Sequence, residues 1–381
     1  KQLMNPFDPD MASMIHNEMR KHGIKLVLGY TVEGFKGKDN GVEVLLKDNP
    51  SLQADMVVLA IGVTPDTVLA KEAGLELGIK ESIVVNDRME TSVPDIYAAG
   101  DAVQVKHYVT GNDALISLAG PANKQGRIIA DNICGGDSRY LGSQGSSVIK
   151  VFDMTAATTG INETNAQKSG LEVDTVILSP MSHAGYYPGG KVMTMKVIFE
   201  KESYRLLGAQ IIGYEGVDKR IDVLATAIHA GLNATQLKDL DLAYAPPYSS
   251  AKDPVNMAGF MIDNIAKGTL KQWHLEDMDK ISKDKDVVLL DVRTVGEFSR
   301  GHIDGFKNIP VDELRERISE IEKGKPVYLI CQSGLRSYIA SRILEGNGYE
   351  TYNFSGGFRF YDAVVNDRAL IERAYACGMD Y

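Results

Sequence analysis

The feature that most constrains this chain is a short apolar segment that ends in a cysteine and leads directly into a helix. Residues 327–331 read VYLIC, and the loop QSGLR of residues 332–336 precedes a helical pattern. Such a loop turns backbone N–H groups inward, and the helix N-terminus adds partial positive charge. We therefore expect Cys331 to be a nucleophilic thiolate and Arg336 to supply a fixed cation. A buried cysteine beside a surface arginine is the alternative that this segment leaves open.

The composition argues against several classes of protein. The chain has 381 residues and a net charge of −10, which disfavours a nucleic-acid partner because such a partner needs a basic face. No apolar run approaches the roughly 18 residues of a membrane helix, and no signal peptide is recognisable. The three cysteines form no CxxC pair. We therefore expect no disulfide scaffold, no metal site and no membrane association, and a cytoplasmic location.

The chain opens on Lys1 and enters a helix almost at once, which suggests a fragment of a longer protein. Asp8 is a suitable N-cap and Pro9 fits the first turn. The apolar face of this helix is formed by Met11, Met14 and Ile15.

Residues 24–62 show the pattern of β-structure. The expected strands are IKLVLG at 24–29, GVEVLL at 41–46 and ADMVVLAIG at 54–62. Asp39, Asn40 and Gly41 supply the turn of a hairpin. A proline-started helix is expected within 64–78, and a loop followed by a helix within 115–133.

The second half of the chain divides into two units. Residues 147–265 contain period-two strands, among them a pair within 192–213 joined by a charged hairpin turn at 200–203. Two helices are expected, at 217–228 and 254–265. A linker at 267–285 carries the only tryptophan, Trp273. From residue 287 short Val, Leu and Ile runs without polar alternation predict a parallel sheet covered on both faces.

The C-terminal motifs LLDVRTVGEFSRGHIDGFKNIP, VYLICQSGLRS and FSGGF resemble the rhodanese family over residues 276–380. This resemblance implies transfer of sulfane sulfur through a Cys331 persulfide. Four residues stand between Cys331 and Arg336, one fewer than in related phosphatases, which suits sulfur better than phosphate. The loop residues that would surround the sulfur are Gln332, Ser333, Gly334 and Leu335. The family motifs also contain four residues that we interpret as a buried salt-bridge network, namely Asp291, Arg293, Glu297 and His302.

A second group of motifs lies in the first half of the chain. TSVPDIYAAGDAV resembles the flavin-binding signature of disulfide reductases with two dinucleotide-binding domains, and it implies FAD contacts from Gly100 and Asp101. An aspartate that caps a turn is the alternative for Asp101. VVLAIGVTPDT resembles the nucleotide-domain motif of the same family and implies a contact of Gly62 with NAD(P)H. LAGPANKQGR resembles coenzyme A-disulfide reductases, and the implied FAD contacts are Leu118, Ala119, Pro121 and Asn123.

HAGYYPGGK and LAYAPPYSSAKDPVN resemble the dimerisation domain of the coenzyme A-disulfide reductases. The resemblance implies a homodimer in which Tyr186 and Tyr244 reach the partner subunit's active site. We interpret Tyr187 as a packing residue. We assign Met193 and Met195 to the core.

These resemblances imply an α/β fold, a partial two-dinucleotide-binding-domain flavoprotein with an α+β dimerisation domain and a rhodanese-like domain that has a parallel sheet. The expected parts are the NAD(P)-domain remnant at 1–65, the FAD-domain part at 66–146, the dimerisation domain at 147–266 and the rhodanese domain at 275–381. The implied activity is NAD(P)H reduction of coenzyme A disulfide, persulfide or polysulfide, coupled to sulfur transfer from donors such as thiosulfate.

Two observations leave other readings open. The sequence contains no GxGxxG loop, which would cradle a pyrophosphate, so we expect this chain not to hold FAD tightly. Neither Cys134 nor Cys377 lies in the context of a redox cysteine, and we interpret Cys134 as structural. The alternatives are a stand-alone sulfurtransferase on a dimeric, non-redox scaffold, or a sulfur-relay module that binds a partner protein.

Overall fold

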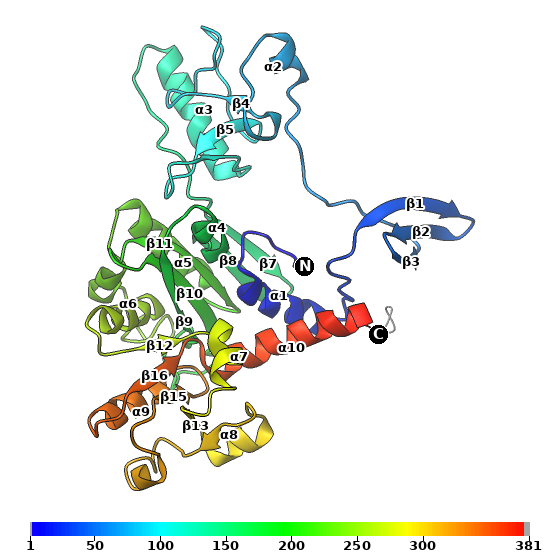
Figure 1. The fold of residues 1–381 in the computed structure, drawn as a ribbon. Helices are drawn as coiled ribbons and strands as arrows, with labels where there is room; N and C mark the ends of the chain where they lie inside the picture. The colour runs from blue at the N-terminus through cyan, green and yellow to red at the C-terminus, as the bar shows by residue number, and fades with distance from the viewer. Residues whose placement is uncertain (1, 377–381) are drawn as a thin grey trace.

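The computed structural model of this chain describes residues 2–376, with side chains up to residue 372, so Cys377 lies outside the described residues. Figure 1 shows a central antiparallel sheet, a second α/β unit below it and a smaller unit above it. A three-stranded meander projects to one side. The helices and strands of residues 2–146 are α1 (Pro9–Lys21), β1 (Val32–Lys38), β2 (Gly41–Leu46), β3 (Asn49–Ala54), α2 (Val68–Glu72), β4 (Ile83–Val84), β5 (Val103–Lys106), β6 (Asp113–Ala114) and α3 (Ala119–Ile133).

The N-terminal part confirms the helix and the hairpin but not two of the strands. The β1–β2 turn lies at Asp39 and Asn40, as expected. Residues 24–29 lie outside every strand in the described structure, and residues 55–63 follow the end of β3 as irregular chain. Ile61 is 94% exposed there. An apolar run forms a buried parallel strand only between neighbouring strands, and none of the described strands flanks this run.

The central sheet has the order β7-β8-β11-β10-β9, and all of its neighbouring strands are antiparallel. Helices α5 and α6 cover one face, where Met193, Met195 and Val197 pack against them. The core assignment of Met193 and Met195 is thus confirmed. The elements of this part are β7 (Ser147–Val151), β8 (Met154–Gly160), α4 (Glu163–Lys168), β9 (Val173–Leu178), β10 (Met193–Glu200), β11 (Leu206–Gly213), α5 (Val217–His229) and α6 (Pro254–Ala266).

The C-terminal unit is built on a parallel sheet of order β12-β16-β15-β13-β14, as expected. The prediction of a linker at 267–285 is wrong, because strand β12 and helix α7 both lie within this range. Trp273 lies on the edge strand β12, is 2% exposed and donates its indole N–H to the Leu329 carbonyl at 3.3 Å. The elements are β12 (Gln272–Trp273), α7 (Met278–Ile281), β13 (Val288–Asp291), α8 (Val295–Arg300), β14 (Lys307–Asn308), β15 (Val327–Ile330), α9 (Leu335–Glu345), β16 (Thr351–Phe354) and α10 (Gly357–Ala376).

The second face of the central sheet is covered by α1 and by the C-terminal unit. One hydrophobic core contains Met11 and Ile15 of α1, Ile212 of β11, and Phe360 and Val364 of α10. Helices α1 and α10 lie side by side in Figure 1. The central sheet and the C-terminal unit therefore share a core and are not joined by a flexible tether.

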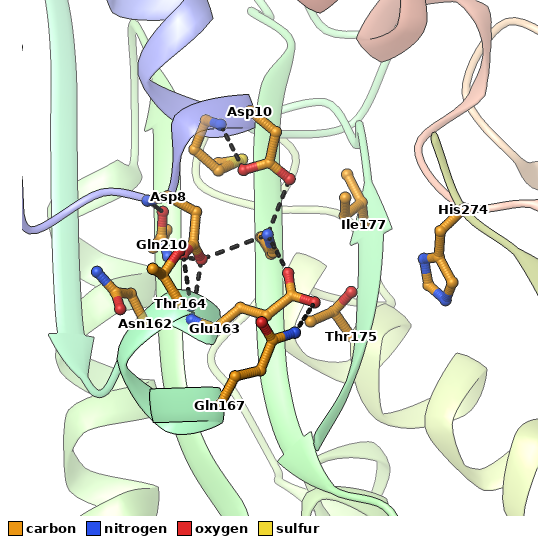
Figure 2. Close-up of polar contacts among 12 residues, drawn as sticks. Asp8, Asp10, Asn162, Glu163, Thr164, Gln167, Thr175, Ile177, Gln210 and His274 are labelled. Carbon is orange, nitrogen blue, oxygen red and sulfur yellow. Dashed lines mark hydrogen bonds and ion pairs between the residues drawn. The ribbon is translucent and has the colours of Figure 1, made fainter. Parts of the chain in front are cut away.

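A buried ion cluster fastens α1 to this face of the sheet (Figure 2). Lys196 of β10 is 1% exposed and contacts Asp10 at 2.8 Å, Glu163 at 2.7 Å and Asp8 at 3.3 Å. Burial alone would lower the pKa of Lys196, but the three carboxylates outweigh it and raise the pKa. We expect from the sequence that the Asp8 side chain caps α1, but it forms no capping hydrogen bond there. It accepts instead from the backbone N–H groups of Glu163 and Thr164, at 3.0 Å each, at the start of α4.

Candidate functional site

Cys331 follows the last residue of β15 and is completely buried. Its Sγ accepts a hydrogen bond from the Gly334 backbone N–H at 3.1 Å and from Ser337 Oγ at 3.2 Å. Gly334 adopts a positive φ of 97°, which a side chain would strain, so the loop can turn its N–H toward the sulfur. Ser337 was not predicted as a site residue. Its hydroxyl in the first turn of α9, six residues after the cysteine, was the signal that could have identified it.

The loop is held from outside by the start of α10. The Phe358 N–H donates to the Cys331 carbonyl at 2.7 Å, and the Arg359 N–H donates to the Gln332 carbonyl at 3.2 Å. A side chain at Gly357 would lie 2.6 Å from the Ser333 nitrogen, so the FSGGF motif needs glycine for this close approach. The start of α10 therefore satisfies two backbone carbonyls of this segment and fixes the loop in place.

Arg336 does not face the sulfur alone. Its two terminal nitrogens form a bidentate pair with Glu297, at 2.7 Å each. The hydrogen bonds from Arg336 lower the pKa of Glu297 to about 2, although partial burial opposes this shift. The same pair raises the pKa of Arg336. The loop cation is therefore already bound to a carboxylate.

The predicted buried network is confirmed for two of its four residues. Arg293 pairs with Asp291 at 2.7 Å, and both side chains are about 1–2% exposed. Glu297 is only half-buried and contacts the loop directly. His302 is exposed, stacks on Phe298 at 4.0 Å and bonds only the carbonyl of that residue, so its assignment to the network is wrong.

Two cavities flank the loop. One holds about 520 Å³ and lies between α6 and the loop, where Ser333, Gly334 and Leu335 form one wall. The other holds about 390 Å³ and lies between the loop residue Gln332 and helices α8 and α10, with Glu297 of α8 in its wall. Leu335 is 65% exposed, so the loop presents an apolar side chain at its surface.

The predicted flavin residues lie near one another. The Gly100 N–H donates to Gln125 Oε1 of α3 at 2.7 Å, and Ser117 Oγ donates to the Asp101 carbonyl at 3.4 Å. Gly100 has a φ of 90°, and no atom beyond its chain neighbours lies within 4 Å of the position of an added Cβ. The first turn of α3 has no side-chain cap, so the N–H groups of Ala119 and Gly120 are not taken up by a capping side chain. The other predicted flavin residues lie at the start of α3, namely Leu118, Ala119, Pro121 and Asn123.

This arrangement fits one end of a flavin nucleotide. Asp101 is exposed beside an open helix N-terminus, where a ribitol or phosphate group can be bound. Gly62 lies in the exposed segment after β3, and the described structure brings none of the other predicted site residues to it. Cys134 is exposed at the end of α3, so the interpretation of it as a packed structural residue is not supported by burial.

Tyr186 and Tyr244 come together at the surface of the central unit. Their hydroxyls are 2.8 Å apart, and this hydrogen bond raises the pKa of Tyr244. Tyr186 is 76% exposed, so the pair is open to a second molecule. Tyr187 contacts the His183 ring edge-on at 5.7 Å but keeps 43% of its surface exposed, so it is only partly packed.

Two features are absent from residues 2–376, the part of the chain that the structure describes. No helix in this range is long and apolar enough to cross a membrane. No group of three or more His, Cys, Asp or Glu side chains in the same range is placed to hold a metal ion.

The fold and the loop are those expected of a disulfide-reductase scaffold joined to a rhodanese-like domain. Family models agree: pyridine nucleotide-disulphide oxidoreductase matches residues 1–126, its dimerisation domain matches residues 146–254, and a rhodanese-like domain matches residues 274–363. The chain belongs to the pyridine nucleotide-disulphide oxidoreductase family and includes a rhodanese domain. Its similarity is to the coenzyme A-disulfide and persulfide reductases of that family.

Three similar proteins illustrate this relationship. An NAD(P)H sulfur oxidoreductase (CoA-dependent) from Pyrococcus abyssi is 36% identical over 253 residues, which are 66% of this chain and 56% of that protein. The structure of reduced Bacillus anthracis CoADR-RHD has a TM-score of 0.92 and 46% identity, over 96% of this chain and 66% of that one. An NAD-dependent persulfide reductase from A. fulgidus has a TM-score of 0.87 and 39% identity, over 95% of this chain and 66% of that one. The chain thus spans a little over half the length of the curated relative.

Proposed function

We propose that this chain is part of a flavoprotein that uses NAD(P)H to reduce coenzyme A disulfide, persulfide or polysulfide, and that its rhodanese domain transfers sulfur through a Cys331 persulfide. The observation that carries the proposal is the sulfur of Cys331, which accepts from the Gly334 N–H and the Ser337 hydroxyl inside the loop. Donors aimed at a sulfur stabilise the negative charge of a thiolate or persulfide.

The chemistry at the loop is nucleophilic substitution at sulfur. The Cys331 thiolate attacks the outer sulfur of a donor such as thiosulfate, a new S–S bond forms, and sulfite leaves with the electron pair of the broken bond. An acceptor thiolate then attacks the outer sulfur of the persulfide, and Cys331 leaves as a thiolate. The neutral donors at Gly334 and Ser337 stay bound to the sulfur that becomes the leaving group.

The first half of the proposal concerns FAD and NAD(P)H. Gly100, Asp101 and the start of α3 would hold part of FAD, and bound FAD supplies two-electron redox chemistry. Tyr186 and Tyr244 would reach the partner subunit's active site in a homodimer. The similarity to coenzyme A-dependent sulfur, disulfide and persulfide reductases favours this proposal over a stand-alone sulfurtransferase on a dimeric, non-redox scaffold.

Mass spectrometry of the intact chain after incubation with thiosulfate tests the sulfur-transfer step. We expect one added sulfur on Cys331 and none in Cys331→Ala, whose fold should be retained because alanine fits the space. Cys134→Ala is the matched control and should load like the wild type, since Cys134 is exposed and remote in sequence from the loop. Sulfur found on Cys134 with Cys331 unmodified would contradict the assignment.

A further inference from the structure

The cavity between α8 and α10 carries charges that the transfer reaction at Cys331 does not need. Its lining includes three arginines, one phenylalanine and two carboxylates, namely Arg293, Arg300, Arg359, Phe358, Glu297 and Asp362. Gln332, the loop residue directly after Cys331, forms part of the same wall. The cavity therefore borders the loop at its cysteine end.

Of the three arginines that line the cavity, one forms an ion pair with a carboxylate, and the other two form none within the described part of the chain. Arg293 is neutralised by Asp291 at 2.7 Å and lies over the Phe358 ring at 3.8 Å, so it is fixed. Arg300 and Arg359 are exposed, and neither guanidinium forms an ion pair with a residue in the described part of the chain.

The cavity keeps a net positive charge after pairing. Glu297 is taken up by Arg336 of the loop in a bidentate pair. Asp362 is then the one lining carboxylate, within the described residues, that is left against Arg300 and Arg359. This excess stands out in a chain whose net charge is −10.

We propose that Arg300 and Arg359 are specificity-determining residues that bind the anionic body of a thiol whose sulfur exchanges with Cys331. The inference rests on the proposed sulfur transfer. A guanidinium binds phosphate or carboxylate through paired N–H donors, and two separate guanidiniums suit a molecule with more than one anionic group. Phosphates, as in coenzyme A, and carboxylates, as in glutathione, share this chemistry.

The exchange is balanced without a further reactant. The thiolate of the bound molecule attacks the outer sulfur of the Cys331 persulfide, the new S–S bond forms on the acceptor, and the electron pair of the old bond returns to Cys331. Arg300 and Arg359 touch only the remote anionic groups, so they set which thiol is used and not the substitution at sulfur.

The test compares thiol acceptors that differ in their anionic groups; coenzyme A and pantetheine carry the same thiol arm, and glutathione carries carboxylates instead of phosphates. Wild type, Arg300→Ala, Arg359→Ala and the double variant are loaded with sulfur to the same occupancy, and loss of the Cys331 persulfide is followed with coenzyme A, pantetheine or glutathione. Arg315→Ala, an exposed arginine outside this cavity, is the control. We expect each single variant to lose about tenfold, and the double variant about a hundredfold, in the second-order rate with coenzyme A.

Pantetheine, which lacks the nucleotide phosphates, should react at a rate that none of the variants changes. Added salt should slow the wild type with coenzyme A and leave pantetheine unaffected. A loss seen with glutathione instead of coenzyme A would support the anion site and assign it to carboxylates. Equal losses with coenzyme A and pantetheine, or no loss with any anionic thiol, would overturn the inference. Wild type that fails to load sulfur would instead contradict the proposed function.

Discussion

At Cys331 the sulfur is surrounded by neutral donors, while the nearby cation is bound elsewhere. The Gly334 N–H and the Ser337 hydroxyl reach Sγ, and Arg336 is held by Glu297. The loop therefore stabilises negative sulfur mainly through dipoles, and the share of Arg336 in binding an anionic donor is reduced by its carboxylate partner. This division could be tested by removing the charge of Glu297 without changing its shape.

Glu297→Gln should leave Arg336 without its counter-charge and lower the KM for thiosulfate about threefold to tenfold, because an unneutralised guanidinium attracts an anion more strongly. The glutamine retains the capping contact with the backbone of α8. Steady-state sulfur transfer measures the effect, and Glu320→Gln, which changes an exposed ion pair in the same domain, is the control. A higher KM would mean that Glu297 positions Arg336 for the donor.

The same pair predicts a pH dependence of stability. The pKa of Glu297 falls from 4.5 to about 2 in the folded protein, mainly through its hydrogen bonds with Arg336. A carboxyl whose pKa is depressed by folding stabilises the fold above its unfolded value, and this contribution disappears as the pH falls toward the folded value. The wild type should therefore lose stability relative to Glu297→Gln between about pH 4.5 and pH 2, as measured by denaturant unfolding. Parallel curves would contradict the prediction.

The site residues that sequence could predict are those joined by local geometry. A strand end, a short loop and a helix start are read from consecutive residues, so Cys331 and the loop were found. Asn353, whose side chain donates to the Gly334 carbonyl at 3.2 Å, and Gly357 come from other elements. His302 was placed in the buried network by its motif alone, but it follows the end of α8, where it is exposed and stacks on Phe298.

At the scale of elements, α1 connects two parts of the chain that are far apart in sequence. Its apolar face was predicted from the spacing of Met11, Met14 and Ile15, and the structure confirms the helix. The spacing could not show that the face is covered by the central sheet and α10 together. Asp367 of α10 contacts His16 at 2.9 Å and also bonds Arg20, so polar contacts follow the same surface.

Lys196→Met should destabilise the protein by about 3–5 kcal/mol, because it leaves buried carboxylates at Asp8 and Asp10 without their cation. Denaturant unfolding measures the loss. Lys150→Met on β7 of the same sheet is the control and should change stability by less than about 0.5 kcal/mol, since Lys150 is exposed. A neutral result for Lys196→Met would show that the cluster contributes no net stability.

Residues 54–62 show where element prediction fails. Their apolar run has the composition of a buried strand, but β-structure depends on neighbours that composition cannot reveal. In the described structure β3 ends at Ala54, and the following side chains are exposed, with Met56 and Val58 both at 75%. By contrast, β10 and β11 were predicted correctly because each forms a hairpin with a partner adjacent in sequence.

At the scale of the whole molecule, the exposed surface of the central unit predicts self-association. Tyr186 and Tyr248 expose 76% and 71% of their surface, and the Tyr186–Tyr244 pair projects outward. We expect a two-fold dimer through residues 147–265 that buries more than about 1,000 Å². Light scattering at micromolar concentration should give twice the chain mass of 41.6 kDa. A monomer at that concentration would contradict the dimer.

The sequence divides the chain into separate domains, whereas the structure gives three of these parts one core. Met11 and Ile15 of α1, Ile212 of the central sheet and Trp273 of the rhodanese sheet belong to the same buried cluster. The boundary between family motifs therefore does not coincide with a boundary in packing. Sequence motifs follow the chemistry of each domain, and contacts between domains leave no local pattern in the chain.

The shared core predicts that the central sheet and the rhodanese unit unfold together. Ile15 is fully buried between them, so Ile15→Ala should destabilise both by about 2–5 kcal/mol. Hydrogen exchange measured by mass spectrometry under increasing denaturant can follow peptides from β10 and from β15 separately. Both sets should show the same opening free energy in the wild type and the same decrease in the variant, because the sheets that they represent lose a common core. Exchange of the β15 peptides at lower denaturant, with β10 still protected, would show that the rhodanese unit unfolds independently and that the buried contacts of α1 do not couple the two sheets.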